Sequence, residues 1–295
     1  MKSLIYLQPE TVQLLQTITS PATNHAHPSV DIEITTEAFQ SCYKMVKERT
    51  SSSPSGRHVG HYKAATNCDA LSTLYATMMS LPFQVGFSPM RWRRVVDIML
   101  EKQPGNSRIH RLRILALLES DFNQAIRIII ARQLSFHVED NKMAPSMQYG
   151  SREGRQCVSA VLNKQLTHDI IRHKKSIAAC IENDAIGCYD RMVNSIMLLE
   201  LRRLGLPTSA AKSLAETWSN AIHHIKTKYG ISEVTYSNTK EVPLFGPGQG
   251  STLGPSMAPA LYSNGKLSIT NHPFCHILLC QWLHNTDRYW GGICG

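Results

Sequence analysis

The sequence has no long apolar run, no Cys-x-x-Cys motif and no recognisable secretory signal. None of its apolar runs approaches the roughly 20 residues that a membrane-spanning helix needs, so we expect no membrane segment. The eight cysteines form no regular framework, which indicates free thiols in a reducing compartment. The N-terminal residues MKSLIYLQPETVQ have too short an apolar run for secretion and no small-residue cleavage site. These absences predict an intracellular protein, in the nucleus or the cytoplasm.

The chain does have enough apolar sequence for a packed core, together with an excess of basic residues. Hydrophobic residues make up 42% and charged residues 18% of its 295 residues, values typical of a globular rather than a disordered protein. This length suits one large domain or two ordinary ones. Lys and Arg number 31 against 22 Asp and Glu, so the formal net charge is +9 at pH 7. A basic balance favours a polyanionic partner such as nucleic acid.

The first candidate functional segment is the stretch 176–192, SIAACIENDAIGCYDRM. Its apolar first half follows a Lys pair and indicates a buried strand that ends near Asp184. Tyr189 follows five residues later, and a second acid, Asp190, comes directly after it. An ordinary strand end capped by a solvated aspartate fits the same residues.

A second segment, residues 100–123, combines a lysine, a Pro-Gly turn, an arginine-rich return and an apolar run. This order predicts two short segments joined by a turn. The turn and its flanks carry Lys102, Arg108, Arg111 and Arg113, so the hairpin is strongly basic. Basic hairpins are also common as solvated surface elements, and that alternative stays open.

Three further segments are rich in glycine or polar residues. Residues 51–56, SSSPSG, predict a flexible turn, and residues 148–152, QYGSR, precede a predicted helix. Residues 242–261 carry Gly246, Gly248 and Gly250 around Gln249. Glycine-rich segments of this kind occur both in phosphate-binding turns and in purely structural ones.

In sequence order, these segments resemble the motifs of reverse transcriptases, in particular those of retroelements without long terminal repeats. Residues 176–192 resemble the strand whose terminal Asp holds catalytic Mg²⁺, and residues 100–123 resemble the fingers hairpin. Residues 148–152 are similar to the Gln-Phe-Gly-Phe-Arg signature before the palm helix. Residues 248–250 match part of the family's Gly-x-x-Gln-Gly segment, although Gly254 stands where Ser is usual. Five partial motifs run in the family's order from about residue 50 to residue 257.

The resemblance implies a helix-rich α+β fold made of right-hand polymerase fingers and a partial palm. It implies RNA-templated addition of deoxynucleotides, with Mg²⁺ as cofactor and with an RNA or DNA template-primer and a deoxynucleoside triphosphate as partners. Asp184 would be the catalytic metal ligand, and Tyr189 the steric gate against a ribose 2′ hydroxyl. By the same resemblance, Lys102 and Arg113 would contact the triphosphate, and Gln249 would contact the nucleotide. The residues that would contact the template or its backbone are Gln148, Gly150, Arg152, Gly248 and Gly250.

The implied organisation has four parts: a leader or linker at 1–34, a fingers-like helical region at 35–175 with a basic hairpin near 100–115, a partial palm at 176–265, and an atypical tail at 266–295. The family's second carboxylate pair lies in an aromatic-x-Asp-Asp hairpin, and this chain contains no Asp-Asp. Beyond residue 257 its only acid is Asp287. We therefore expect a reverse transcriptase region that stops inside the palm and lacks polymerase activity as written.

Local patterns predict most of the helices. Two helices are predicted to start at Thr35 or Thr36 and at Asp69. Four more are predicted over residues 90–100, after Ser88-Pro89, and over residues 122–138, 194–204 and 208–228. In the span 90–100, Trp92, Val95, Val96 and Met99 fall at helical spacing and are expected in the core. A strand is predicted at 231–237, and the adjacent His223 and His224 are not expected to form a metal pair.

Two alternatives belong to other functional classes: a non-catalytic nucleic-acid-binding remnant, which the basic charge permits, and a helical protein of unrelated function. The tail places His276, Cys280 and His284 four residues apart, so a zinc site is conceivable. Ordinary helix packing or an out-of-frame tail is the favoured interpretation, because established zinc patterns pair their ligands more regularly.

Overall fold

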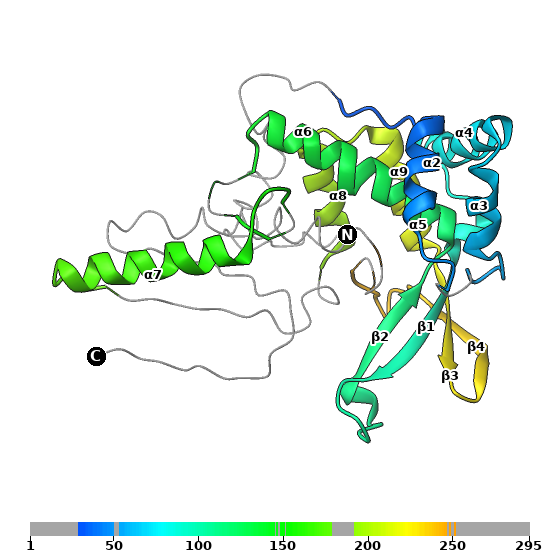
Figure 1. The fold of residues 1–295 in the computed structure, drawn as a ribbon. Coiled ribbons are helices and arrows are strands. Elements are labelled where there is room, and N and C mark those ends of the chain that lie inside the picture. Colours follow the sequence, from blue (N-terminus) through cyan, green and yellow to red (C-terminus); the bar gives the residue numbers. More distant parts are fainter. Residues whose placement is uncertain are drawn as a thin grey trace, which may run out of the picture. The chain divides into compact units, whose positions relative to one another are not determined.

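The computed structural model describes residues 29–49, 53–144, 146, 148–150, 152–178, 192–246, 248 and 251. Within this part the protein is α+β, as predicted, with helices and a four-stranded mixed sheet (Figure 1). Contacts divide the chain into a larger unit, Met1–Pro145 with Gly187–Gly265, and a smaller unit, Ser146–Ile186 with Lys266–Gly295. The predicted site residues Asp184, Tyr189, Gln249 and Gly250 lie outside the described residues.

The larger unit holds most of the described helices. They are α2 (Thr36–Met45), α3 (Val59–Ala65), α4 (Asp69–Val85), α5 (Ser120–Ile128), the π-helical η3 (Ile129–Leu134), α6 (Ser135–Asp140), α8 (Asn194–Arg203) and α9 (Thr208–Ser219). Short 3-10 helices, η1 (Met90–Arg93) and η2 (Ile109–Arg111), precede two of the strands. The smaller unit contributes α7 (Cys157–His173). No helix in the described part of the chain is long and apolar enough to cross a membrane.

Local chemistry accounts for several helix boundaries. The Thr35 hydroxyl accepts the Ala38 backbone N–H, so Thr35 caps α2 as predicted, and Glu37 lies favourably in the first turn. Helix α2 ends at Met45. Elements α5, η3 and α6 form one helical run over residues 120–140, which confirms the long helix predicted at 122–138.

The core lies between the helices of the larger unit and is dominated by large side chains. Trp92 packs between Phe83 and Phe122, with ring centroids 5.5 and 4.9 Å away. Trp92 is 1% exposed, so its predicted core position is confirmed. The apolar face predicted on the long helix is also confirmed, since its residues Ile126, Ile129, Ile130 and Leu134 are all buried.

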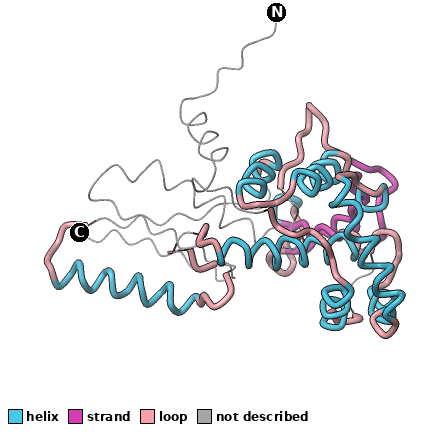
Figure 2. The backbone as a smooth tube through the Cα atoms, turned by 90° about the horizontal axis from the view of Figure 1, so that it is seen from above, coloured by secondary structure: helices cyan, strands magenta, loops and turns pink. Residues whose placement is uncertain are grey.

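The sheet is built from β1 (Arg94–Glu101), β2 (Leu112–Leu117), β3 (Ile222–Thr227) and β4 (Gly230–Ser237), in the order β2-β1-β3-β4. Figure 2 shows these strands grouped beside the helices of their unit. Strands β1 and β2 pair antiparallel, as do β3 and β4, while β1 and β3 pair parallel. Because each of the parallel strands leads into a hairpin turn, both turns lie at the same end of the sheet (Figure 1).

The helix predicted at 90–100 is wrong and the helix predicted at 208–228 is right only as far as Ser219, and the same pairing explains both differences. Residues 90–100 form η1 followed by β1, and residues 208–228 form α9 followed by β3. In the parallel register Val95 lies beside His223, and Asp97 lies beside Ile225. Each strand supplies backbone partners to the other from more than 120 residues away, and that pairing overrides the local helical spacing. The strand predicted at 231–237 is confirmed as β4.

Candidate nucleic-acid interface

The β1–β2 hairpin extends away from the helices of its unit, as Figure 1 shows. Burial decreases along β1: Val95, Val96 and Asp97 are buried, whereas Leu100 and Glu101 are exposed. This confirms the two segments and the turn predicted for residues 100–123. The base of the hairpin therefore packs on the core, and its tip is available to a partner.

A tight turn shapes the tip. The Asn106 backbone N–H donates to the Gln103 carbonyl at 3.1 Å, and Gly105 has a φ of 82°. Proline at the second turn position and glycine with positive φ at the third are typical of a type II turn. The Gly105 N–H also donates to Glu101 Oε2 at 2.8 Å. The only acid of residues 100–117 is thus engaged within the turn.

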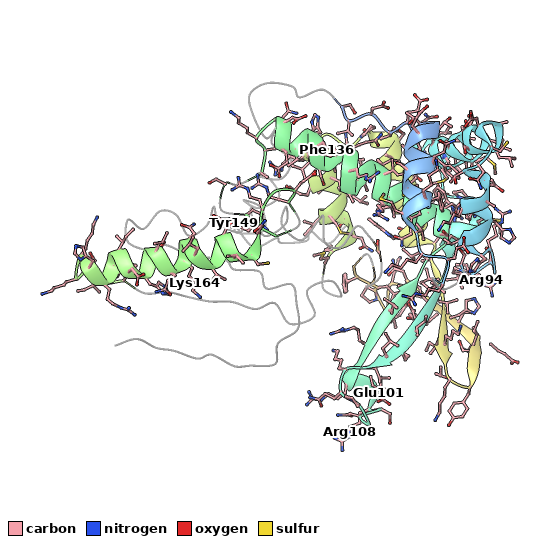
Figure 3. The ribbon with its side chains drawn as sticks, viewed as in Figure 1. Arg94, Glu101, Arg108, Phe136, Tyr149 and Lys164 are labelled. Carbon is pink, nitrogen blue, oxygen red and sulfur yellow. The ribbon has the colours of Figure 1, made fainter. Side chains whose placement is uncertain are left out.

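The tip of the hairpin and its flanks carry four exposed cations: Lys102, Arg108, Arg111 and Arg113. None of them forms an ion pair with a carboxylate of the described residues. Arg113 lies opposite Leu100 across the strands, and the Lys102 N–H donates to the Arg111 carbonyl at 3.3 Å. Lys102 and Arg113 are therefore diagonal neighbours, close enough for both long side chains to reach one polyphosphate. Figure 3 labels Arg108 and Glu101 at this tip.

The β3–β4 turn adds more positive charge at the same end of the sheet. Lys226 and Lys228 are exposed, and the Lys228 ammonium lies 4.9 Å from the centroid of the Tyr229 ring. Tyr229 itself is 88% exposed. Lys226 is paired in register with Ile98 of β1, so this turn lies at the same end of the sheet as the β1–β2 tip. An exposed aromatic ring beside cations is an arrangement that suits nucleic acid, because bases stack on the ring while cations contact phosphates.

The glycine-rich segment approaches the hairpin at Ala116 of β2. A Cβ atom on Gly248, whose φ is +76°, would lie only 2.8 Å from the Ala116 Cβ. The Gly246 N–H donates to the Met192 carbonyl at 2.7 Å, and the Ser251 N–H donates to the Gly248 carbonyl at 3.3 Å. Position 248 therefore requires glycine for both its space and its backbone conformation. Met192 is the last residue of the stretch 176–192, so the glycine-rich segment contacts both the hairpin and the end of that stretch.

A buried polar cluster that the sequence patterns did not reveal lies beside this contact. Asp97, which is opposite Ala116 in the register, is 1% exposed, and its Oδ2 lies 2.8 Å from His223 Nδ1. The Tyr236 hydroxyl donates to the same Asp97 oxygen, and the His223 and Tyr236 rings stack 4.9 Å apart. Burial, together with the hydrogen bond to the negative Asp97, raises the pKa of Tyr236 above its ordinary value. The cluster links β1, β3 and β4.

A second buried cluster fixes the base of the hairpin. The Arg91 guanidinium lies 3.5 Å from Glu119 and forms an ion pair with Asp121. Asp121 Oδ1 also accepts the Trp92 indole N–H at 3.2 Å, and Glu119 accepts the Ser55 N–H at 2.7 Å. Residues just before β1 and just after β2 are thereby held to each other and to the turn predicted at 51–56.

The smaller unit contains the segment predicted to contact the template. Arg152 Nη1 donates to the Gln148 carbonyl at 3.0 Å, and Gln148 Nε2 donates to the Gly150 carbonyl at 3.4 Å. The Arg155 guanidinium lies 5.8 Å from the centroid of the Tyr149 ring. The structure thus brings Gln148, Gly150 and Arg152 together in one half-buried turn before α7, the predicted helix.

The predicted metal ligand, Asp184, lies outside the residues that the structure describes. Residues 176–178, the start of the strand predicted to carry Asp184, are described and are not in a strand. No group of three or more His, Cys, Asp or Glu side chains that could hold a metal ion occurs among the residues that the structure describes. The residues of the conceivable zinc site at 276–284 are likewise not described.

No protein-family model and no curated protein matches the chain. The resemblance to reverse transcriptases therefore stands on the residues of the motifs alone.

Proposed function

We propose that the chain is a reverse transcriptase-like region, with fingers and part of a palm, from a retroelement without long terminal repeats. Its partners are an RNA or DNA template-primer and a deoxynucleoside triphosphate. The supporting observation is a series of contacts that links three motif segments. Gly248 approaches Ala116 of the basic hairpin, and Gly246 is hydrogen-bonded to Met192 at the end of the stretch 176–192, although the segments lie far apart in the sequence.

The chemistry of the hairpin tip suits a nucleotide. Lys102 and Arg113 provide a point charge and a bidentate fork for a triphosphate, and no carboxylate of the described residues neutralises either one. At the other tip, Tyr229 and the two lysines beside it provide a stacking surface and contacts to phosphate.

By the resemblance, Asp184 would hold Mg²⁺, which when bound activates the primer 3′ hydroxyl and stabilises the leaving pyrophosphate. Tyr189 would exclude a ribose 2′ hydroxyl from the nucleotide site. The chain has no Asp-Asp pair to supply the further carboxylates. We therefore propose that the 295-residue chain binds its nucleic acid without extending a primer.

The first test compares binding of a labelled RNA template annealed to a DNA primer across a salt series. The purified chain should bind at low salt, and in the presence of the complementary deoxynucleoside triphosphate the Lys102→Ala/Arg113→Ala variant should bind about tenfold more weakly there. The log-log salt slope should also fall by about 0.9 for each phosphate that the variant no longer neutralises. The matched control is Lys44→Ala/Lys212→Ala, which removes two exposed lysines from helices α2 and α9. Equal reductions in both variants, or no binding at low salt, would contradict the proposal.

The second test is primer extension on an RNA template. We expect none from the chain as written. Extension that Asp184→Ala abolishes would support the reverse transcriptase assignment and show that the absence of an Asp-Asp pair does not prevent activity.

A second candidate function is nucleic-acid binding without nucleotide recognition, which the cationic character of both hairpin tips favours. It predicts salt-dependent binding that Asp184→Ala leaves intact. It also predicts that a deoxynucleotide complementary to the template does not slow dissociation of the template-primer. A reverse transcriptase-like site predicts slower dissociation, and Lys102→Ala should remove that effect.

A further inference from the structure

Asp97 of β1 joins the two hairpins of the sheet through its side chain. Its Oδ2 atom lies 2.8 Å from His223 Nδ1 of β3, and the same atom accepts the Tyr236 hydroxyl of β4. Among the residues that the structure describes, no other side-chain hydrogen bond or ion pair connects the β1–β2 hairpin with the β3–β4 hairpin. These three side chains, the Asp97 cluster, therefore make the polar side-chain connection between the two elements that carry the basic tips.

The backbone connection between the two hairpins is short and lies at their base. Parallel pairing of β1 with β3 covers five register pairs and ends with Ile98 opposite Lys226. The basic residues Lys102 and Lys228 follow this last pair in their strands and turns. Because the pairing stops there, the direction of one tip relative to the other depends on the contacts at the base.

Strand β3 is irregular between the base of its hairpin and its tip. Its register with β4 shifts between His224 and Lys226, and the Ile225 N–H donates to the Ser232 hydroxyl at 3.0 Å. An irregularity of this kind bends a strand and increases its local twist. The Asp97 cluster lies on the base side of the irregularity, so it fixes the orientation from which the bend directs the tip.

We propose that Asp97, acting through His223 and Tyr236, is a positioning residue that aligns the β3–β4 tip with the β1–β2 tip, so that one template-primer contacts both. Asp97 is 1% exposed, so it acts on the direction of Lys226 and Lys228 rather than on the ligand. The rings of His223 and Tyr236 stack 4.9 Å apart, which holds β3 against β4 at the same point. This role rests on the proposed function, because the template-primer is the ligand for which the tips are aligned.

A positioning role and a purely structural role differ in what they do to the two lysines. Without the Asp97 cluster, Lys226 and Lys228 keep their charge but no longer reach the phosphates of a template-primer that the β1–β2 tip holds. Removing the two lysines should then cost nothing further in salt dependence. A cluster that only stabilises the fold would leave the contribution of the lysines unchanged in every variant that is folded.

The test is a double-mutant cycle on the salt series with labelled template-primer. In the wild type, Lys226→Ala/Lys228→Ala should lower the log-log salt slope by about 0.9 for each phosphate that it no longer neutralises. His223→Ala should lower the slope by the same amount, and adding the lysine substitutions to it should lower the slope no further. His223→Asn should restore most of the wild-type slope, because its amide nitrogen is bonded to Cγ as Nδ1 is and can donate to Asp97.

Two further variants separate position from charge and from stability. Tyr236→Phe changes no charge and should lower the slope in the same direction as His223→Ala. The matched control is Ser80→Ala, which removes a buried hydrogen bond to the Ile34 N–H in helix α4 and should leave the slope unchanged. Far-UV circular dichroism and the thermal midpoint confirm that each variant is folded. If His223→Ala unfolds, Tyr236→Phe with and without the lysine substitutions completes the cycle.

The outcomes distinguish the positioning role from the proposed function. A wild type that does not bind at low salt contradicts both. If the wild type binds but Lys226→Ala/Lys228→Ala leaves its slope unchanged, only the positioning role is overturned. The same holds if the lysine substitutions lower the slope as much in His223→Ala as in the wild type, if His223→Asn behaves like His223→Ala, or if Ser80→Ala lowers the slope equally.

Discussion

Asp97 depends on partners that are 126 and 139 residues away in the chain, His223 and Tyr236. Both partners contact the same carboxylate oxygen of a side chain that is 1% exposed. A buried carboxylate destabilises a fold unless such contacts satisfy it, so the loss of one partner leaves a buried group partly unsatisfied. The contribution of this cluster to stability should therefore be measurable at single residues.

Tyr236→Phe should lower the free energy of unfolding at pH 7 by about 1–2 kcal/mol, because Asp97 loses a charged hydrogen bond. The folded protein holds the Tyr236 proton more tightly than the unfolded chain does, because the pKa is raised. That stabilisation is complete below about pH 10, where unfolded tyrosine begins to ionise, and it is lost as the pH rises further. The difference between wild type and variant should therefore narrow above about pH 10.

Urea unfolding at several pH values measures this difference. Tyr43, whose pKa is also raised, mainly by burial, titrates in both proteins and cancels in the comparison. Tyr229→Phe is the matched control, because Tyr229 is 88% exposed in the same sheet and should change stability by less than about 0.5 kcal/mol. If the loss of stability in Tyr236→Phe did not depend on pH, that result would contradict a raised pKa of Tyr236 in the folded protein.

Among the elements, those whose pattern is local were predictable and those that depend on a distant partner were not. The capped start of α2, the apolar face around Ile126 and Ile130, and the Pro-Gly hairpin all follow from residues within a few positions of one another. The run 90–100 has helical spacing but also the β-branched Val95 and Val96, and its pairing with β2 and β3 decides between helix and strand. The Asp97 cluster was missed for the same reason, because its members come from three strands.

The base of the hairpin is the element most sensitive to a single change. Arg91→Ala should lower the free energy of unfolding by about 3 kcal/mol, because it leaves the buried Glu119 and Asp121 without their cation. The expected loss lies at the low end of the range for breaking a buried ion pair, because the Arg91 side chain is 31% exposed. Arg94→Ala, three residues further on and exposed, should change stability by less than about 0.5 kcal/mol. Chemical denaturation of the two variants measures both effects, and similar losses of stability would show that Arg91 has no special role.

At the scale of the whole molecule, the order of the motifs could be predicted from the sequence, whereas their assembly into one site could not. The hairpin cations and Gly248 are described: Gly248 lies against Ala116 of β2, and the cations lie nearer the tip of the same hairpin. Gln148, Gly150 and Arg152 belong to the other unit, and Asp184 is outside the described residues. The catalytic role of Asp184 and the contacts of Gln249 thus stay predictions from the family resemblance.

The parallel pairing of β1 with β3 makes a prediction for the complete interface. Since both hairpin tips lie at one end of the sheet, one template-primer should contact both tips at once. Lys226→Ala/Lys228→Ala should then lower the log-log salt slope of binding by about 0.9 for each phosphate that these lysines neutralise in the wild type. Combining this variant with Lys102→Ala/Arg113→Ala should add the two reductions, because the four side chains would bind separate phosphates. A salt slope that the β3–β4 variant leaves unchanged would show that nucleic acid binds the β1–β2 tip alone.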